Sequence, residues 1–424
     1  MGASDPQDRR GAVAAYVAVT AAYWAFMLTD GALRMLVLLH FHTLGFSPIE
    51  LAWLFLLYEF MGMVTNLCAG WIAARFGLTA TLYAGLALQV AALVALTRLD
   101  PGWAVATSVA FVMVVQGASG VAKDLAKMSS KSAVKLLAPT GEHGALFRWV
   151  ALLTGSKNAV KGIGFLLGAS LLALVGFQAS VIAMAVVLAA ILVAVMLAMP
   201  AGLPRGSRKV PFRDVFSRSG AINRLSAARL FLFGARDVWF VVGIPIYFTA
   251  VLSDGTQEGN RTAFFLVGGF MALWIIGYGA VQAVAPRLLG ARETTVARTV
   301  AQVRLWAAIL TLIPAGLALA AALAGAPAGW LTAVLVAGLL VFGGVFAINS
   351  ALHSFLVLAY AQAEHVTKDV GFYYMSNAAG RLAGTLLSGV SYQLGGLWLC
   401  LATAAVMCAM SRVLAGRLPE TAPG

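Results

Sequence analysis

The sequence predicts an all-α integral membrane protein with twelve transmembrane helices arranged in two six-helix halves. Three observations lead to this fold class. The chain has 424 residues, of which 61% are hydrophobic and only 11% are charged. Its mean hydropathy of +0.90 is typical of membrane proteins. Long apolar segments also follow one another along the whole chain, with short turns between them.

Each predicted span is long enough to cross a hydrocarbon core of about 30 Å, which takes about 20 apolar residues in a helix. The spans are predicted at residues 12–39, 48–73, 79–98, 103–127, 147–175, 178–199, 224–251, 262–286, 296–322, 329–352, 370–394 and 396–415. The first begins with an uncharged run without a small-residue cleavage site, so we interpret it as a span and not as a cleaved signal peptide.

The positive charges fall in alternate loops. One set of loops contains Arg75, the basic stretch 205–218 and Arg292, whereas the alternate loops are nearly free of Lys and Arg. By the positive-inside rule the basic loops and both termini are predicted to be cytoplasmic. The net charge of +13 therefore reflects membrane topology, and no nucleic-acid partner is expected.

The chain divides near its middle. Residues 1–200 are predicted to form an N-terminal six-helix bundle, 201–223 a basic cytoplasmic linker with a short surface helix, and 224–424 a C-terminal six-helix bundle. A short internal similarity between Gly31–Arg34 and Gly234–Asp237 agrees with two related halves.

Two pairs of glycines have the spacing of closely packed membrane helices. They are Gly164 with Gly168 in the fifth span and Gly380 with Gly384 in the eleventh. Glycines four residues apart lie on one face of a helix and let a neighbouring backbone approach closely. We therefore predict that both of these spans pack tightly against other helices.

Lysines recur every four residues from Lys123 through Lys127 and Lys131 to Lys135. On a helix this spacing places them along one ridge. Lys161 repeats the pattern in the next span, where it follows Lys157 by four residues and is expected near the middle of the membrane. Each central Lys costs roughly 2.5–3.5 kcal/mol to insert, so Lys157 and Lys161 are predicted to line a polar cavity. The later lysines of the ridge are predicted to line its cytoplasmic mouth or, alternatively, to lie on an interfacial extension of the helix.

Other spans also carry charges. Asp30 and Arg34 are four residues apart and are predicted to pair on one face of the first span. Arg229 and Arg236 are seven apart and are expected to share a face of the seventh. The candidate substrate-binding residues are Arg34, Lys123, Lys127, Lys157, Asn158, Lys161, Arg229, Arg236, Tyr373, Asn377 and Arg381. The candidate gating or proton-coupling residues are Asp30, Glu59, Asp124 and Asp237.

Cations outnumber acids in these predicted spans, which indicates an anionic cargo. Arginine offers two parallel hydrogen bonds to a phosphate or carboxylate group, and lysine offers a point charge. Cys68, Cys400 and Cys408 lie in apolar segments without metal-ligand spacing, so no metal and no cofactor is expected. There is also no nucleophile–base pair for an enzyme acting on phosphorylated lipid. The residues alone predict a transporter of small organic polyanions, with its direction left open.

The turn from Gly70 to Gly77 resembles the loop signature of the major facilitator superfamily, although Ala74 occupies its acidic position. Longer runs resemble the ArsJ family of organoarsenical efflux permeases within that superfamily. They are Tyr23–Met35, Tyr58–Leu67, Gly120–Lys131, Arg148–Gly162 and Leu225–Phe240.

The resemblance implies a major facilitator fold in the inner membrane of a bacterium and export of 1-arseno-3-phosphoglycerate as part of arsenate resistance. Glyceraldehyde-3-phosphate dehydrogenase would supply this cargo without forming a stable complex. The chain is expected to act as a monomer with membrane lipid as its surroundings. The alternative within transport is an exchanger of phosphorylated organic anions, of the sugar-phosphate type, with no role in arsenic resistance.

Overall fold

The structure is a computed structural model, and it describes residues 6–137, 143–199, 219–289, 295–361 and 366–421. Within these ranges the chain is helical and contains no strand, which confirms the predicted all-α class. In chain order the elements are α1 (Pro6–Thr43), α2 (Pro48–Leu67), α3 (Ala69–Leu96), α4 (Val105–Leu137), α5 (His143–Ala198), α6 (Gly220–Val238), η1 (Trp239–Gly243), α7 (Ile244–Leu252), α8 (Gln257–Leu288), α9 (Val296–Ala324), α10 (Gly329–Tyr360) and α11 (Val366–Gly416).

The described residues contain 10 helices that are long and apolar enough to cross a membrane. Two of them hold apolar stretches of 43 and 48 residues, in α5 and α11. At about 1.5 Å per residue each stretch is more than twice as long as the hydrocarbon core of about 30 Å is thick. Each is interrupted by a glycine in the left-handed region, Gly176 with φ 79° and Gly396 with φ 67°. The count of twelve stays a prediction, which rests on dividing both helices at these glycines.

Side-chain caps fix where several helices begin. The hydroxyl of Ser47 accepts a hydrogen bond from the backbone N–H of Glu50, and the Glu50 carboxylate accepts one from the backbone of Ser47. This capping box, with Pro48 at the first helical position, starts α2. The hydroxyls of Thr256 and Thr295 cap α8 and α9 with a single hydrogen bond each, accepted from the backbone N–H of Gly259 and of Arg298.

A π-helical segment, η1, lies between α6 and α7. The Ser388 hydroxyl of α11 accepts hydrogen bonds from the backbone N–H groups of Val242 and Gly243, at 3.1 and 3.3 Å. Pro245 lies two residues beyond the end of η1 and lacks a backbone N–H of its own. Single π-helical turns inside α-helices are common at functional sites, and this one begins two residues after Asp237 of the charged pair Arg236–Asp237.

Small residues let α1 approach α5 and α6 approach α11. A Cβ atom at Gly168 would meet the carbonyl oxygen of Ala32, and one at Gly164 would come within 2.5 Å of the Leu28 carbonyl oxygen. A Cβ atom at Gly380 would likewise meet backbone atoms of α6. These contacts confirm the predicted close packing of both glycine pairs.

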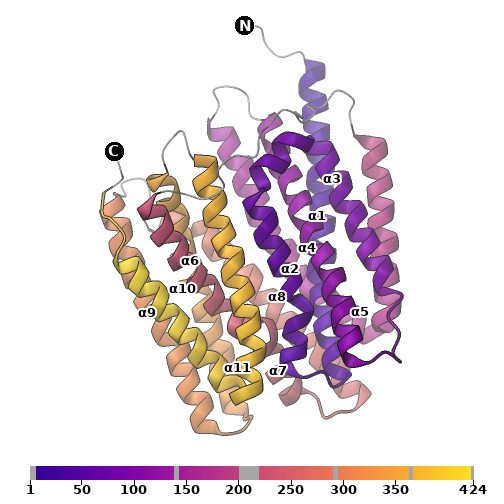
Figure 1. Ribbon diagram of the computed structural model, residues 1–424, viewed down its shortest axis with the longest axis vertical. Coiled ribbons are helices and arrows are strands. Elements are labelled where there is room, and N and C mark those ends of the chain that lie inside the picture. Colours follow the sequence, from indigo (N-terminus) through magenta and orange to yellow (C-terminus); the bar gives the residue numbers. More distant parts are fainter. Residues whose placement is uncertain (1–5, 138–142, 200–218, 290–294, 362–365, 422–424) are drawn as a thin grey trace.

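Figure 1 shows α1–α5 on one side of the bundle and α6, α9, α10 and α11 on the other, with α7 and α8 between them. The two groups contact each other mainly through α2 with α11 and α5 with α8. The first residues of α1 and the last of α11 lie at the same end of the bundle. The domain limits and the cytoplasmic side stay predictions, and most of the predicted linker, residues 200–218, lies outside the described residues.

Candidate functional site

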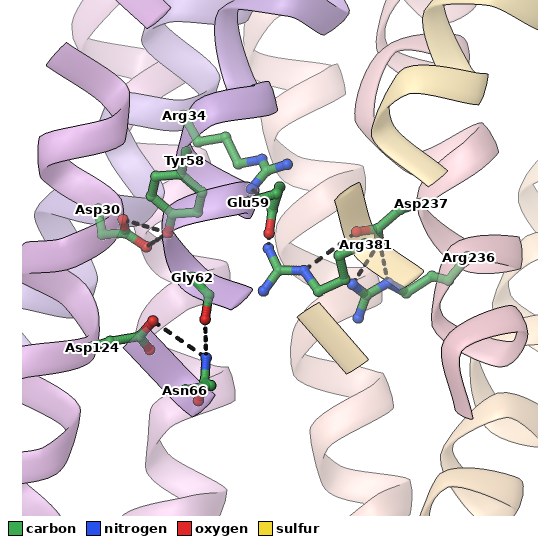
Figure 2. A network of polar contacts seen from close by, with 10 residues as sticks. All are labelled: Asp30, Arg34, Tyr58, Glu59, Gly62, Asn66, Asp124, Arg236, Asp237 and Arg381. Carbon is green, nitrogen blue, oxygen red and sulfur yellow. Dashed lines mark hydrogen bonds and ion pairs between the residues drawn. The ribbon is translucent and has the colours of Figure 1, made fainter. Parts of the chain in front are cut away.

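One buried carboxylate joins the two groups of helices. Glu59 of α2 is only 1% exposed. Its Oε1 atom accepts a hydrogen bond from Nη1 of Arg34 on α1 at 2.9 Å and another from Nη2 of Arg381 on α11 at 2.6 Å. Figure 2 shows Glu59 between these two arginines. The contact therefore connects residues that are 322 positions apart in the chain.

A second carboxylate continues the network within the C-terminal half. Nε of Arg381 donates to Asp237 of α6 at 3.3 Å, and Nε of Arg236 donates to the same carboxyl group at 2.6 Å (Figure 2). Three guanidinium groups thus share the carboxylates of Glu59 and Asp237. Both carboxylates are about 1% exposed, whereas the arginine side chains are 11–18% exposed.

The predicted pair of Asp30 and Arg34 is wrong. Arg34 pairs with Glu59, and both carboxylate oxygens of Asp30 accept hydrogen bonds from the hydroxyl of Tyr58, at 2.7 and 3.0 Å (Figure 2). The reason is the position of α2, which presents Tyr58 and Glu59 as neighbours on the side facing α1. Glu59, which was predicted as a gating or proton-coupling residue, is contacted by two arginines.

Aromatic faces surround the arginines. The guanidinium carbon of Arg34 lies 5.0 Å from the centre of the Phe55 ring and 5.6 Å from that of Tyr58. Arg236 is similarly placed against Phe233, at 5.1 Å. Such rings attract a cation while excluding water. These aromatic residues were not among the predicted site residues, and only their helical spacing from the arginines could have indicated them.

A second polar cluster lies between α2 and α4. Asp124, 1% exposed, accepts hydrogen bonds from the Thr65 hydroxyl at 2.5 Å and from the Asn66 amide at 3.3 Å. Lys127 donates to Asn66 at 2.7 Å and lies 3.4 Å from Asp124, so its charge is partly balanced. Its Nζ atom also lies 5.9 Å from the ring centre of Tyr374, which belongs to α11. Thr65 and Asn66 were not among the predicted site residues.

Lys123 and Lys161 differ from the paired cations. Nζ of Lys123 lies 4.1 Å from the ring centre of Tyr58, and Nζ of Lys161 lies 5.6 Å from that of Phe165. In the part of the chain that the structure describes, neither ammonium group forms an ion pair with a carboxylate. Both residues are on helices of the N-terminal half that contact α1 or α2.

The remaining predicted site residues fall into three places. Lys157 precedes Lys161 by one turn of α5, and Asn158 packs against Gly279 of α8, at the second contact between the halves. Asn377 precedes Arg381 by one turn of α11. The side chains of Lys131 and Lys135 lie outside the described part of the chain, so their predicted place on the lysine ridge is untested.

Arg229 and Tyr373 form a separate group from the central network. Arg229 donates to the backbone carbonyl oxygen of Ser350 on α10 at 3.1 Å, and its guanidinium carbon lies 5.0 Å from the ring centre of Tyr373. The two turns of α6 between Arg229 and Arg236 correspond to about 10 Å.

The central group contains six cationic side chains and four carboxylates. The cations are Arg34, Lys123, Lys127, Lys161, Arg236 and Arg381, and the acids are Asp30, Glu59, Asp124 and Asp237. An excess of positive charge at the contact between two helical halves suits an anionic ligand. Among the described residues, no group of three or more His, Cys, Asp or Glu side chains could hold a metal ion.

This architecture defines a membrane transporter. Residues 18–385 match the family model described as Major Facilitator Superfamily. The chain belongs to this superfamily, as the sequence resemblance predicted. No curated protein matches the sequence.

Solved structures of other transporters share the fold. A POT family transporter in complex with a thioalcohol conjugated peptide is 14% identical, with 95% of each chain covered and a TM-score of 0.69. A POT family transporter in complex with 5-aminolevulinic acid is 14% identical over 97% of this chain and 96% of that one, with a TM-score of 0.70. A mutant of the nucleoside transporter NupG is 16% identical over 94% and 98%, with a TM-score of 0.65.

Proposed function

We propose that this protein exports a small organic polyanion, 1-arseno-3-phosphoglycerate, as part of arsenate resistance. The observation that carries the proposal is the pair Lys123 and Lys161, which have no carboxylate partner among the described residues of the central group. A buried cation without a counter-ion is costly unless the cargo supplies the negative charge. The sequence resemblance to arsenate-ester permeases names the cargo.

The arginines differ from these lysines because they already form ion pairs with a carboxylate of the protein. Arg34 and Arg381 are already held by Glu59, so a cargo must compete with this carboxylate for their hydrogen-bond donors. An oxyanion can do so because it accepts two parallel hydrogen bonds from a guanidinium group. Releasing Arg381 from Glu59 would break the ion pair between α2 and α11. Cargo binding would thereby loosen the contact between the halves, as alternating access requires.

In this scheme Glu59 and Asp237 are gating residues. They hold Arg381 while no cargo is bound, and they let it turn toward the cargo when an oxyanion arrives. Asp30 and Asp124 hold Tyr58 and Lys127 in place through hydrogen bonds. If protons drive export, an acid of this set must take up and release them, and Glu59→Gln should then abolish the response of flux to a pH gradient.

The test measures arsenate tolerance and export of the arsenate ester in arsenate-sensitive bacteria that express the chain. Tolerance should require both this protein and glyceraldehyde-3-phosphate dehydrogenase. Lys161→Ala should reduce export at least tenfold at unchanged amounts of membrane-inserted protein. Arg412→Ala, at an exposed position of α11, is the matched control and should export normally. Normal export by Lys161→Ala would remove this lysine from the site.

The alternative, an exchanger of phosphorylated organic anions, uses the same cations, because phosphate and arsenate esters present similar oxygens. It predicts counterflow of a labelled sugar phosphate into loaded vesicles and no dependence of arsenate tolerance on the dehydrogenase. Counterflow without any effect on arsenate tolerance would replace the arsenic role with this one and keep the anion site.

A further inference from the structure

A second group of buried polar side chains lies within the C-terminal half, about 10 Å along α6 from the central network. Its centre is Arg229, which is 3% exposed. In the part of the chain that the structure describes, no carboxylate pairs with this guanidinium group. The Ser350 carbonyl oxygen and the faces of Phe233 and Tyr373, at 4.1 and 5.0 Å, are its contacts.

The turn of α10 that Arg229 contacts carries polar side chains without partners. His353 is fully buried, and neither of its ring nitrogens has a hydrogen-bond partner. Asn349 is 1% exposed, and neither its amide nitrogen nor its oxygen has one. Both residues are on α10, one turn apart on a common face. Arg229 reaches this turn of α10 by donating to the backbone carbonyl oxygen of Ser350, which lies between them in the sequence.

Unpartnered buried polar groups are costly, and most proteins satisfy them with a neighbour or an ordered water. Water alone would supply hydrogen bonds but would leave the charge of Arg229 unbalanced. Three of the unpartnered atoms are donors, because the Arg229 Nε, the Asn349 amide nitrogen and one His353 nitrogen carry hydrogen, and the Asn349 oxygen and the other His353 nitrogen are acceptors. An anion meets both needs, because it accepts these hydrogen bonds and balances the charge.

We infer that Arg229, Asn349 and His353 form a second anion-binding site, which is closed in this structure and holds one oxyanion group of the phosphate type. The unpartnered Nε side of Arg229 faces the oxyanion, and the amide of Asn349 and the ring of His353 donate from α10. The site is distinct from the central one, because Glu59 and Asp237 take no part in it. It does not depend on the cargo being an arsenate ester.

Binding of labelled inorganic phosphate to the purified full-length protein tests the inference. The number of phosphates bound per chain should fall by one when Arg229→Met is introduced, both in the natural sequence and in Lys161→Ala protein. The affinity of that site should fall at least tenfold in Asn349→Leu. Arg412→Met should bind as the natural sequence does. Because the measurement counts phosphates, it gives an answer whether or not Lys161 belongs to the transport site.

An unchanged number of phosphates in Arg229→Met would overturn the inference. If Arg229→Met does not yield a monodisperse protein, Asn349→Leu and His353→Phe decide, because each replaces a neutral polar side chain with an apolar one of similar size. Full phosphate binding in both of these variants would also overturn it. Loss of export in Lys161→Ala tests the central site only, so failure of the proposed function is recognised separately.

Discussion

The crossing of α1 with α5 and the crossing of α6 with α11 share one packing arrangement but carry different charges. In the first, Gly164 and Gly168 lie against the backbone of α1. In the second, Gly380 and Gly384 lie against the backbone of α6. The two crossings therefore place their helices equally close, one in each half of the chain.

The polar residues beside these glycines differ. Three positions before the first glycine, α5 has Lys161 and α11 has Asn377, and one position after it α5 has Phe165 and α11 has Arg381. Lys161 contacts an aromatic ring and, among the described residues, no carboxylate, whereas Arg381 contacts two carboxylates. The glycine contacts fix the backbone positions in both halves, but they do not determine which charged side chains lie next to the glycines. Within the central group, the cations without an ion pair among the described residues, Lys123 and Lys161, lie in the N-terminal half, whereas Arg236 and Arg381 of the C-terminal half are both ion-paired.

The largest expected effect is at the contact that joins the two crossings. Glu59→Gln leaves Arg34 and Arg381 without their shared carboxylate in a largely buried setting. Removing one partner of a buried ion pair typically costs about 3–5 kcal/mol, so we expect the free energy of unfolding to fall by this amount. Denaturant unfolding in detergent, followed by tryptophan fluorescence, measures it.

Glu258→Gln is the control for that measurement, because Glu258 is exposed in the first turn of α8. It should change the unfolding free energy by less than about 0.5 kcal/mol. Equal stability of Glu59→Gln and Glu258→Gln would mean that water, and not Glu59, balances the arginines. The distinction between ion-paired arginines and unpaired lysines in the central group would then have no energetic basis.

The sequence was sufficient to predict most of the fold, because apolar length and turn residues act locally. The predicted second span begins at residue 48, where the capping box of Ser47 starts α2. The predicted turns near residues 176 and 396 contain the two glycines that interrupt α5 and α11. The π-helical segment was not predicted, since it depends on Ser388, which is 146 positions away from Val242.

The candidate site was predictable as a set of residues but not as a set of partners. Arg34, Glu59 and Arg381 were all selected as charges in apolar sequence, where a charge has few structural uses. Their mutual contacts join positions 25 and 322 residues apart, and these depend on the rotation of each helix in the bundle. Local spacing suggested Asp30 for Arg34 instead, because a pattern within one helix carries no information about the next one.

The next effect tests whether the two crossings are equivalent. Gly168→Ala and Gly380→Ala each place a methyl group on a backbone carbonyl of the facing helix, so the helices must separate. We expect each change to lower the unfolding free energy by about 1–3 kcal/mol. Gly277→Ala, inside α8 with open space around it, should be neutral or slightly stabilising. Sensitivity at only one crossing would show that the shared packing does not matter equally in both halves.

The smallest effect concerns the helix that carries Arg236 and Asp237. Ser388→Ala removes the hydroxyl that accepts hydrogen bonds from the Val242 and Gly243 backbone in the π-helical segment. Losing this acceptor should cost about 1 kcal/mol, and it should also lower export if the segment orients the charged pair that precedes it. Ser376→Ala is the matched control, because the Ser376 hydroxyl bonds only within its own helix, to the Phe372 carbonyl oxygen. If the two variants behave alike in both stability and export, the hydrogen bonds from η1 to Ser388 do not orient Arg236 and Asp237, and the glycine contact between α6 and α11 is sufficient to position them.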